Sequence, residues 1–293
     1  MEFEQFVLSN EPVIRIGFFV GVFALIAAWE LMAPQRRLTV SKALRWSNNL
    51  GLVLLNTVLL RLMFPAAAVG MAAFSAANGW GLLNHFGVPF WVALPVAVVA
   101  MDFVIWMQHV MVHAVPVLWR LHRVHHADLD YDLTTGARFH PIEMVLSMLI
   151  KIATIALLGP PVLAVVIFEV LLNAAAMFNH GNIRLPAGVD RVLRWVIVTP
   201  DMHRVHHSVE EDETNSNFGF NLPWWDRLFG TYRAQPRAGQ VGMTIGLHDH
   251  TDPREVARLD GMLLMPFRSD VEGYAINRRT WSEKKNPDDC TTL

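Results

Sequence analysis

The sequence is poor in cysteine and in charge. Its single cysteine, Cys290, excludes an intrachain disulfide and any CxxC metal or redox motif. Charged residues make up 17% of the 293 residues, against roughly a quarter in an average soluble domain. The formal net charge of −2 argues against a nucleic-acid-binding protein. The acidic start, Met-Glu-Phe-Glu, also lacks the basic stretch that opens a secretory signal peptide.

Apolar residues are abundant. They make up 53% of the chain, and the mean hydropathy is positive, which favours an integral membrane protein. Three apolar stretches are about long enough to cross a bilayer core, namely residues 16–33, 50–71 and 88–107. Arg36, Arg37 and Lys42 follow the first stretch, whereas residues 72–87 contain no lysine or arginine. Because basic connectors tend to stay in the cytoplasm, the connector after the first stretch is predicted to be cytoplasmic.

A fourth apolar stretch, residues 144–177, is interrupted by Gly159-Pro160-Pro161. As one straight helix it would be about 50 Å long, which exceeds the bilayer core. Glycine followed by two prolines is a strong helix break. We therefore predict two short arms that enter the membrane and return, so that His140 and His180 lie on the same side.

The histidines form three boxes, separated along the chain but regular in spacing. The boxes are His109 with His113, then His122, His125 and His126, then His203, His206 and His207. Residues three or four positions apart share one face of a helix, so each box is expected to direct its imidazoles to one point. Imidazole binds iron, copper, zinc and nickel, and the boxes supply more nitrogens than one tetrahedral ion needs. The spacing therefore favours a two-metal centre.

These features together predict an all-α integral membrane protein. We expect about three transmembrane helices plus a re-entrant or short helical hairpin, with a cytoplasmic helical cap that carries the histidine boxes. The predicted parts are N-terminal membrane helices in residues 1–87, a histidine-bearing catalytic domain in 88–235 and a polar C-terminal tail in 236–293.

The boxes and their surroundings resemble the membrane fatty acid hydroxylase/sterol desaturase superfamily. The resemblance covers roughly residues 90–235. Besides the boxes, it rests on Pro116-Val-Leu-Trp-Arg120, on Thr134-Thr-Gly-Ala-Arg-Phe-His-Pro-Ile-Glu143, on Asn179-His-Gly-Asn182, on Pro200-Asp-Met-His203, on Asn217-Phe-Gly-Phe-Asn221 and on Trp225-Asp-Arg-Leu-Phe-Gly-Thr231.

The resemblance implies a non-haem di-iron oxidoreductase that uses dioxygen to hydroxylate or desaturate a lipid, a sterol or a similar apolar molecule. It implies two iron ions, which zinc can replace during purification. It also implies an external electron donor of the cytochrome b5, ferredoxin or reductase type. The family's metal-binding histidines correspond to His109, His113, His122, His125, His126, His180, His203, His206 and His207.

Four further residues are candidates either for metal binding or for a hydrogen bond to a metal ligand, namely Asp102, His140, Asn179 and Asp201. Asp102 lies seven residues before His109, on nearly the same helix face, and could instead bond to a neighbouring helix. His85 falls on the predicted far side of the membrane and is excluded.

The superfamily name does not choose the reaction. Ether-lipid cleavage is the alternative within the superfamily, although Ala114 stands where many ether-cleaving relatives carry an acidic residue. A metal carrier or transporter without catalysis is an alternative of another class, but it would need a histidine path across the bilayer. A haem-binding electron carrier would need histidine pairs deep within facing helices.

Overall fold

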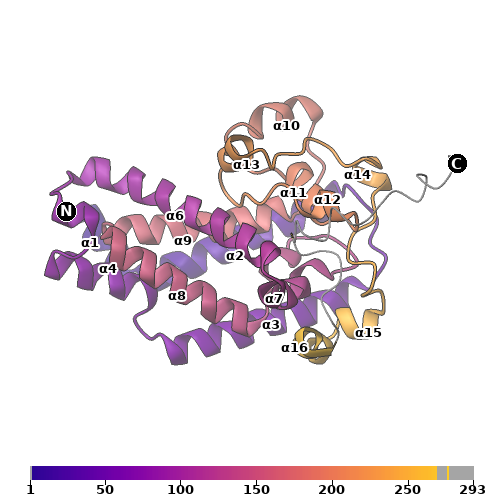
Figure 1. Cartoon of the computed structure of the whole chain (residues 1–293), viewed down its shortest axis with the longest axis horizontal. Helices are drawn as coiled ribbons and strands as arrows, with labels where there is room; N and C mark the ends of the chain where they lie inside the picture. The colour runs from indigo at the N-terminus through magenta and orange to yellow at the C-terminus, as the bar shows by residue number, and fades with distance from the viewer. Residues whose placement is uncertain (1, 269–275, 277–293) are drawn as a thin grey trace, which may run out of the picture.

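The computed structural model describes residues 2–268 and residue 276, and this part of the chain is helical, with isolated β-bridges but no strand. The long helices are α2 (Glu11–Met32), α3 (Lys42–Met63), α6 (Phe90–Ala114), α8 (Pro141–Leu158) and α9 (Val162–Asn179). Figure 1 shows them running side by side along the long axis of the molecule. The all-α prediction is confirmed.

Five helical segments are long and apolar enough to cross a membrane. They are α2, the segment Lys42–His85, α6, α8 and α9. These segments correspond to the three predicted spans and the two arms of the predicted hairpin. Large apolar side chains remain exposed along them, among them Leu31, Leu54 and Trp91, as expected of surfaces that face lipid.

The second span differs from the prediction, which ran without a break from residue 50 to residue 71. Helix α3 ends at Met63, and Pro65 follows. Proline has no backbone N–H and clashes with the preceding turn, so the helix cannot continue through it. The chain resumes as α4 (Ala67–Asn78) and α5 (Leu82–His85). A short first helix, α1 (Glu2–Ser9), buries Val7 beside Leu163 and Val166 of α9.

The predicted hairpin is present as α8 and α9, joined at residues 159–161. Gly159 ends α8 in the left-handed conformation, with φ of +64°, and Pro161 is the N-cap of α9. The turn packs tightly on the residues before α5, because a Cβ on Gly159 would lie 2.2 Å from the Trp80 carbonyl oxygen. Helices α4 and α6 contact both arms. His140 caps the start of α8 and His180 the end of α9, so both lie at one end of the bundle.

Shorter helices gather at this end, towards the right in Figure 1, and together we call them the cap. The cap contains α7 (Pro116–His126), the 3-10 turn η1 (Thr135–Ala137), α10 (Ala187–Leu193), α11 (Pro200–His206), α12 (Glu211–Thr214) and α13 (Trp224–Phe229). Two of these helices, α10 and α13, lie above the bundle in this view.

The region expected to be a polar tail is in part packed structure. It contains α14 (Gly239–Gly242), α15 (Pro253–Val256) and α16 (Leu259–Arg268). Met262 and Met265 of α16 are buried in a cluster with Trp119 and Val124 of α7. His250 in this region is 6% exposed and lies 3.3 Å from Glu255. Apolar residues in a stretch that is polar on average explain the difference. Apart from Ile276, the predicted tail beyond residue 268 lies outside the described residues.

We predict that Gly159→Ala destabilises the protein more than Gly79→Ala. Both glycines end a helix in the left-handed conformation, so each alanine pays the conformational cost of about 1–2 kcal/mol. Only at Gly159 would the added Cβ also meet backbone atoms, because nothing lies within 4 Å of it at Gly79. Thermal unfolding of both variants in one detergent measures the difference, and equal melting temperatures would contradict a tightly packed hairpin turn.

Candidate metal centre

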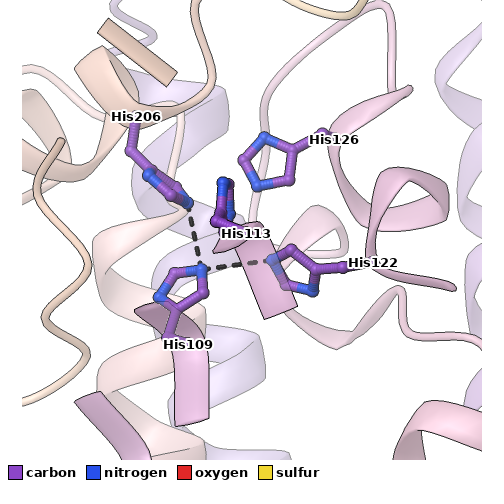
Figure 2. A group of neighbouring side chains, drawn as sticks. All are labelled: His109, His113, His122, His126 and His206. Carbon is purple, nitrogen blue, oxygen red and sulfur yellow. Dashed lines mark hydrogen bonds between the residues drawn. The ribbon is translucent and has the colours of Figure 1, made fainter. Parts of the chain in front are cut away.

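The structure gathers nine histidines into two neighbouring groups, both buried. The five-histidine group consists of His109, His113, His122, His126 and His206, and the four-histidine group consists of His125, His180, His203 and His207. Within each group one nitrogen of every ring lies within 4.8 Å of those of the others. Figure 2 shows the rings of the five-histidine group converging from α6, α7 and α11.

Each histidine triplet is divided between the two groups, contrary to our expectation of one target per box. On α7, His122 and His126 face the five-histidine group and His125 faces the other. On α11 the division is reversed, since His203 and His207 belong to the four-histidine group and His206 does not. Residues four apart are about 40° apart around a helix, whereas the third residue points about 60° to the other side. The same triplet can therefore serve two adjacent sites.

Backbone carbonyls select the tautomer of three of these rings. The Nδ1 atoms of His109, His206 and His180 lie 2.7, 2.7 and 2.8 Å from the carbonyl oxygens of Phe218, Ser216 and Ala176, respectively. A carbonyl can only accept, so each Nδ1 carries the proton. The Nε2 atom of each ring is then left with a lone pair.

These lone pairs point at one another. The Nε2 atom of His109 lies 3.0 Å from that of His206 and 3.1 Å from that of His122. Since neither His109 nor His206 has a proton on Nε2, the close approach is repulsive unless a cation stands between them. Two nitrogens bound at about 2.0–2.1 Å to one metal ion would be about 2.9–3.4 Å apart. The observed separations fit that range.

The four-histidine group has the same arrangement around His180. Its Nε2 lies 3.2 Å from each Nε2 of His125, His203 and His207. In the five-histidine group, the Nε2 atoms of His113 and His126 are buried and have no hydrogen-bond partner among the described residues. Orphaned nitrogens and facing lone pairs both fit a metal ion in each group.

Burial keeps the rings outside the long helices neutral. It lowers the pKa of His180 to about 3. Burial, reinforced by the neighbouring imidazoles, also puts the pKa values of His125, His126, His203, His206 and His207 well below the usual value. Neutral imidazole is the form that binds metal.

Three residues near the groups were not assigned a role from the sequence. Glu143 lies 2.7 Å from Nδ1 of His122, where a carboxylate fixes the ring and increases the basicity of its other nitrogen. Tyr131 packs its ring on His180, with centroids 5.5 Å apart, and donates its hydroxyl to the Asn179 carbonyl. Asp226 accepts hydrogen bonds from the Phe218 and Gly219 amides, and so holds the carbonyl used by His109. Glu143 and Asp226 belong to the motifs 134–143 and 225–231, on which the family resemblance rests. Their position in these motifs was the one sequence feature that could have indicated a role at the site.

None of the four additional candidates joins either group. His140 accepts from the Ile142 amide at Nδ1, and its Nε2 lies 3.3 Å from the Leu263 carbonyl, so both of its nitrogens are engaged. Asp102 accepts hydrogen bonds from the side chains of Asn221 and Trp225. It therefore bonds to a neighbouring part of the chain, which was the alternative to a hydrogen bond with a metal ligand.

The side chains of Asn179 and Asp201 contact groups other than the nine grouped histidines. The Asn179 side chain donates to the Phe220 carbonyl. Asp201 pairs with Arg204 at 2.6 Å, and the Arg204 guanidinium lies 5.1 Å from the centre of the Tyr131 ring. His85, which the sequence analysis excluded as a ligand, is on α5 and belongs to neither group. That the nine grouped histidines bind metal stays a prediction.

We predict that Glu143 controls metal affinity in the five-histidine group alone. Glu143→Leu removes the acceptor at His122 and should weaken binding there by roughly 10- to 100-fold. Glu143→Gln keeps an acceptor oxygen for His122, so its metal affinity should fall much less. Chelator competition followed by metal analysis measures both variants, and equal losses would contradict a role for the hydrogen bond.

His180 and His140 provide a second, matched comparison. His180→Ala removes the ring that approaches all three others of its group, so we expect bound metal to fall by about one ion per chain. His140→Ala should keep the full metal content and lose only helix-cap stability, typically about 1 kcal/mol. Metal loss in His140→Ala equal to that in His180→Ala would contradict the grouping.

Comparison with known proteins agrees with this geometry. Residues 94–231, which contain all nine grouped histidines, match the family model described as fatty acid hydroxylase. The chain is 26% identical over 235 residues to an ornithine lipid hydroxylase of Rhizobium tropici, covering 78% of this chain and 69% of that protein. No solved structure matches this chain.

Alkylglycerol monooxygenases are similar over a shorter region. The Xenopus tropicalis protein is 30% identical over 148 residues, which is 49% of this chain and 31% of that protein. The human protein is 27% identical over 153 residues, or 50% and 32% of the two chains. This chain thus spans about a third of the length of those relatives. The family match and the relatives together support the resemblance of the histidine-bearing part of this chain to the membrane fatty acid hydroxylase superfamily.

Proposed function

We propose that this protein is a membrane-bound di-iron oxidoreductase that uses dioxygen to hydroxylate or desaturate a lipid. The observation that carries the proposal is the pair of buried, all-imidazole groups at one end of a bundle of apolar helices. The family match supports a lipid-modifying oxygenase. An all-nitrogen donor set suits iron, although copper, zinc and nickel accept it too.

The side chains have distinct tasks in this proposal. The nine grouped histidines would hold two iron ions, which supply activation of dioxygen for attack on an unactivated C–H bond. Glu143 and the carbonyls of Phe218, Ser216 and Ala176 keep the imidazole protons on Nδ1, which leaves Nε2 free to bind. Burial of the rings excludes water from the site.

We place the histidine end of the bundle in the cytoplasm. The connector between α2 and α3 carries Arg36 and Arg37 and lies at this end, where the Arg36 amide donates to the Asn182 side chain. The connecting segment at the opposite end, residues 79–89, which includes α5, contains no lysine or arginine. This asymmetry follows the positive-inside rule. A cytoplasmic electron donor of the cytochrome b5, ferredoxin or reductase type could then reach the cap.

The substrate is proposed to be a membrane lipid. The ornithine lipid hydroxylase matches 78% of this chain and the alkylglycerol monooxygenases about half, so lipid hydroxylation leads and ether-lipid cleavage is second. Ala114 at the end of the first box favours hydroxylation over cleavage. Lipid profiles of a neutral host expressing the protein separate the two, because hydroxylation adds one oxygen atom to an intact lipid and ether cleavage removes an alkyl chain.

We predict that the purified protein in lipid nanodiscs, reconstituted with iron and supplied with an electron donor of the ferredoxin and reductase type, binds about two iron ions per chain and consumes dioxygen with a lipid substrate. His125→Ala should reduce this turnover at least 100-fold, because it removes a ligand of the four-histidine group. His85→Ala is the matched control and should retain turnover. Oxygen consumption that is equal in both variants would contradict the proposal.

A further inference from the structure

The cap carries an exposed apolar surface that is not part of the candidate membrane-spanning helices. It is formed by α10, residues 194–196 and α13, and we call these segments the lateral lobe. Its large exposed side chains are Val189, Val192, Trp195, Val196, Trp224, Leu228 and Phe229. The exposed fractions reach 67% for Val192 and 70% for Leu228. A contiguous apolar patch of this kind marks an interaction surface.

The lateral lobe is two-sided. Val189 and Val192 of α10 are exposed at helical spacing, so they share one face, and Val196 in the turn that follows the helix is exposed as well. Asp190 and Arg194 lie on the other side, buried and ion-paired to each other. This arrangement is typical of a helix that lies along a membrane surface.

The apolar face of the lobe adjoins α6 beside exposed apolar side chains of that helix. Val96 and Met107 are 44% and 40% exposed and lie on the same face of α6 as the half-buried Phe103, whereas Trp106 is buried beneath α13. The ring of Phe229 stacks on Trp106, with centroids 4.7 Å apart, and also lies 6.1 Å from Phe103. These two residues precede His109 by three and six positions, which places them about 4.5 and 9 Å further along the helix axis. Helix α13 therefore reaches back beside a candidate membrane span, and Figure 1 shows α13 and α10 beside the bundle rather than beyond its end.

The lobe also has the side chains that favour a lipid–water boundary. Trp195 and Trp224 are linked by a hydrogen bond from the Trp224 indole to the Trp195 carbonyl. The Arg227 guanidinium lies 3.8 Å from the Trp195 ring and 3.9 Å from the Tyr232 ring. Arg191 is exposed next to Val192. Tryptophan and arginine are both favoured where acyl chains meet headgroups.

We infer that the lateral lobe inserts its apolar face into the headgroup and upper acyl region of the leaflet at the histidine end. The occupant of this surface is then lipid, because the patch adjoins a face of α6 that is itself expected to contact lipid. A lipid substrate in this leaflet lies at the depth of the histidine groups and reaches the cap without entering water. This inference is independent of the iron chemistry proposed above.

Site-directed spin labelling tests the inference in the full-length protein. In a Cys290→Ser background, cysteine is introduced by Val192→Cys, Leu228→Cys or Val241→Cys and labelled with a nitroxide. Val241 is the matched control, since it is a 65% exposed apolar residue on α14, away from the bundle. Accessibility to dioxygen and to a water-soluble nickel chelate is measured in nanodiscs of neutral phospholipid.

We expect the labels at 192 and 228 to be several-fold more accessible to dioxygen than to nickel, and the label at 241 to show the reverse. Three labels with equal, high nickel accessibility would overturn the inference. Labels at 192 and 228 shielded from both reagents would overturn it as well, because a protein partner or a second copy of the chain would then cover the lobe.

Discussion

The convergence of neutral imidazoles that present lone pairs to one another is the constraint on which the rest of this structure depends. Facing lone pairs at 3.0 Å, as between His109 and His206, are unfavourable by themselves. They persist only if the surrounding structure holds each ring in place and a cation takes up their electron density. The carbonyls that fix the tautomers come from α9 and from residues 216–218. The groups are therefore a product of the whole cap and not of the boxes alone.

Buried carboxylates connect that cap to the membrane helices. Arg45 of α3 donates to both oxygens of Asp128, at 2.8 and 2.7 Å, just beyond the second box. Burial raises the pKa of Asp128, but Arg45 and Arg138 lower it to about 2, so the carboxylate stays ionised. Glu30 of α2 accepts from the amides of Leu133 and Asn182. Removing one partner of a buried pair leaves an uncompensated charge, so these contacts constrain how the cap sits on the bundle.

Hydrogen bonds also fix the backbone of residues 216–219, after the third box. Asn217 adopts a left-handed backbone conformation, with φ of +51°, and its side chain donates to the Met202 and Arg233 carbonyls. Asp226 binds the next two amides. As a result, the carbonyls on either side of Asn217 point to His206 and His109. A loop without regular structure thereby sets the chemistry of rings on two different helices.

The sequence by itself determined four of the five apolar segments, the hairpin turn at Gly159 and the eight box histidines that come together, because each of these depends on local periodicity or on one strong helix breaker. The ninth histidine, His180, has no such local pattern and was assigned through the resemblance to a known family. Only the tertiary structure decided how each triplet divides between two groups, since spacing sets an angle around one helix but not the position of its neighbours. For the same reason the sequence could not say that Asp102 bonds to Trp225 or that His140 caps α8. The packing of α16 on α7 could not be predicted from the sequence either. The few apolar residues of α16 are buried only because α7 presents an apolar surface to them, and the sequence does not show that the two helices are neighbours.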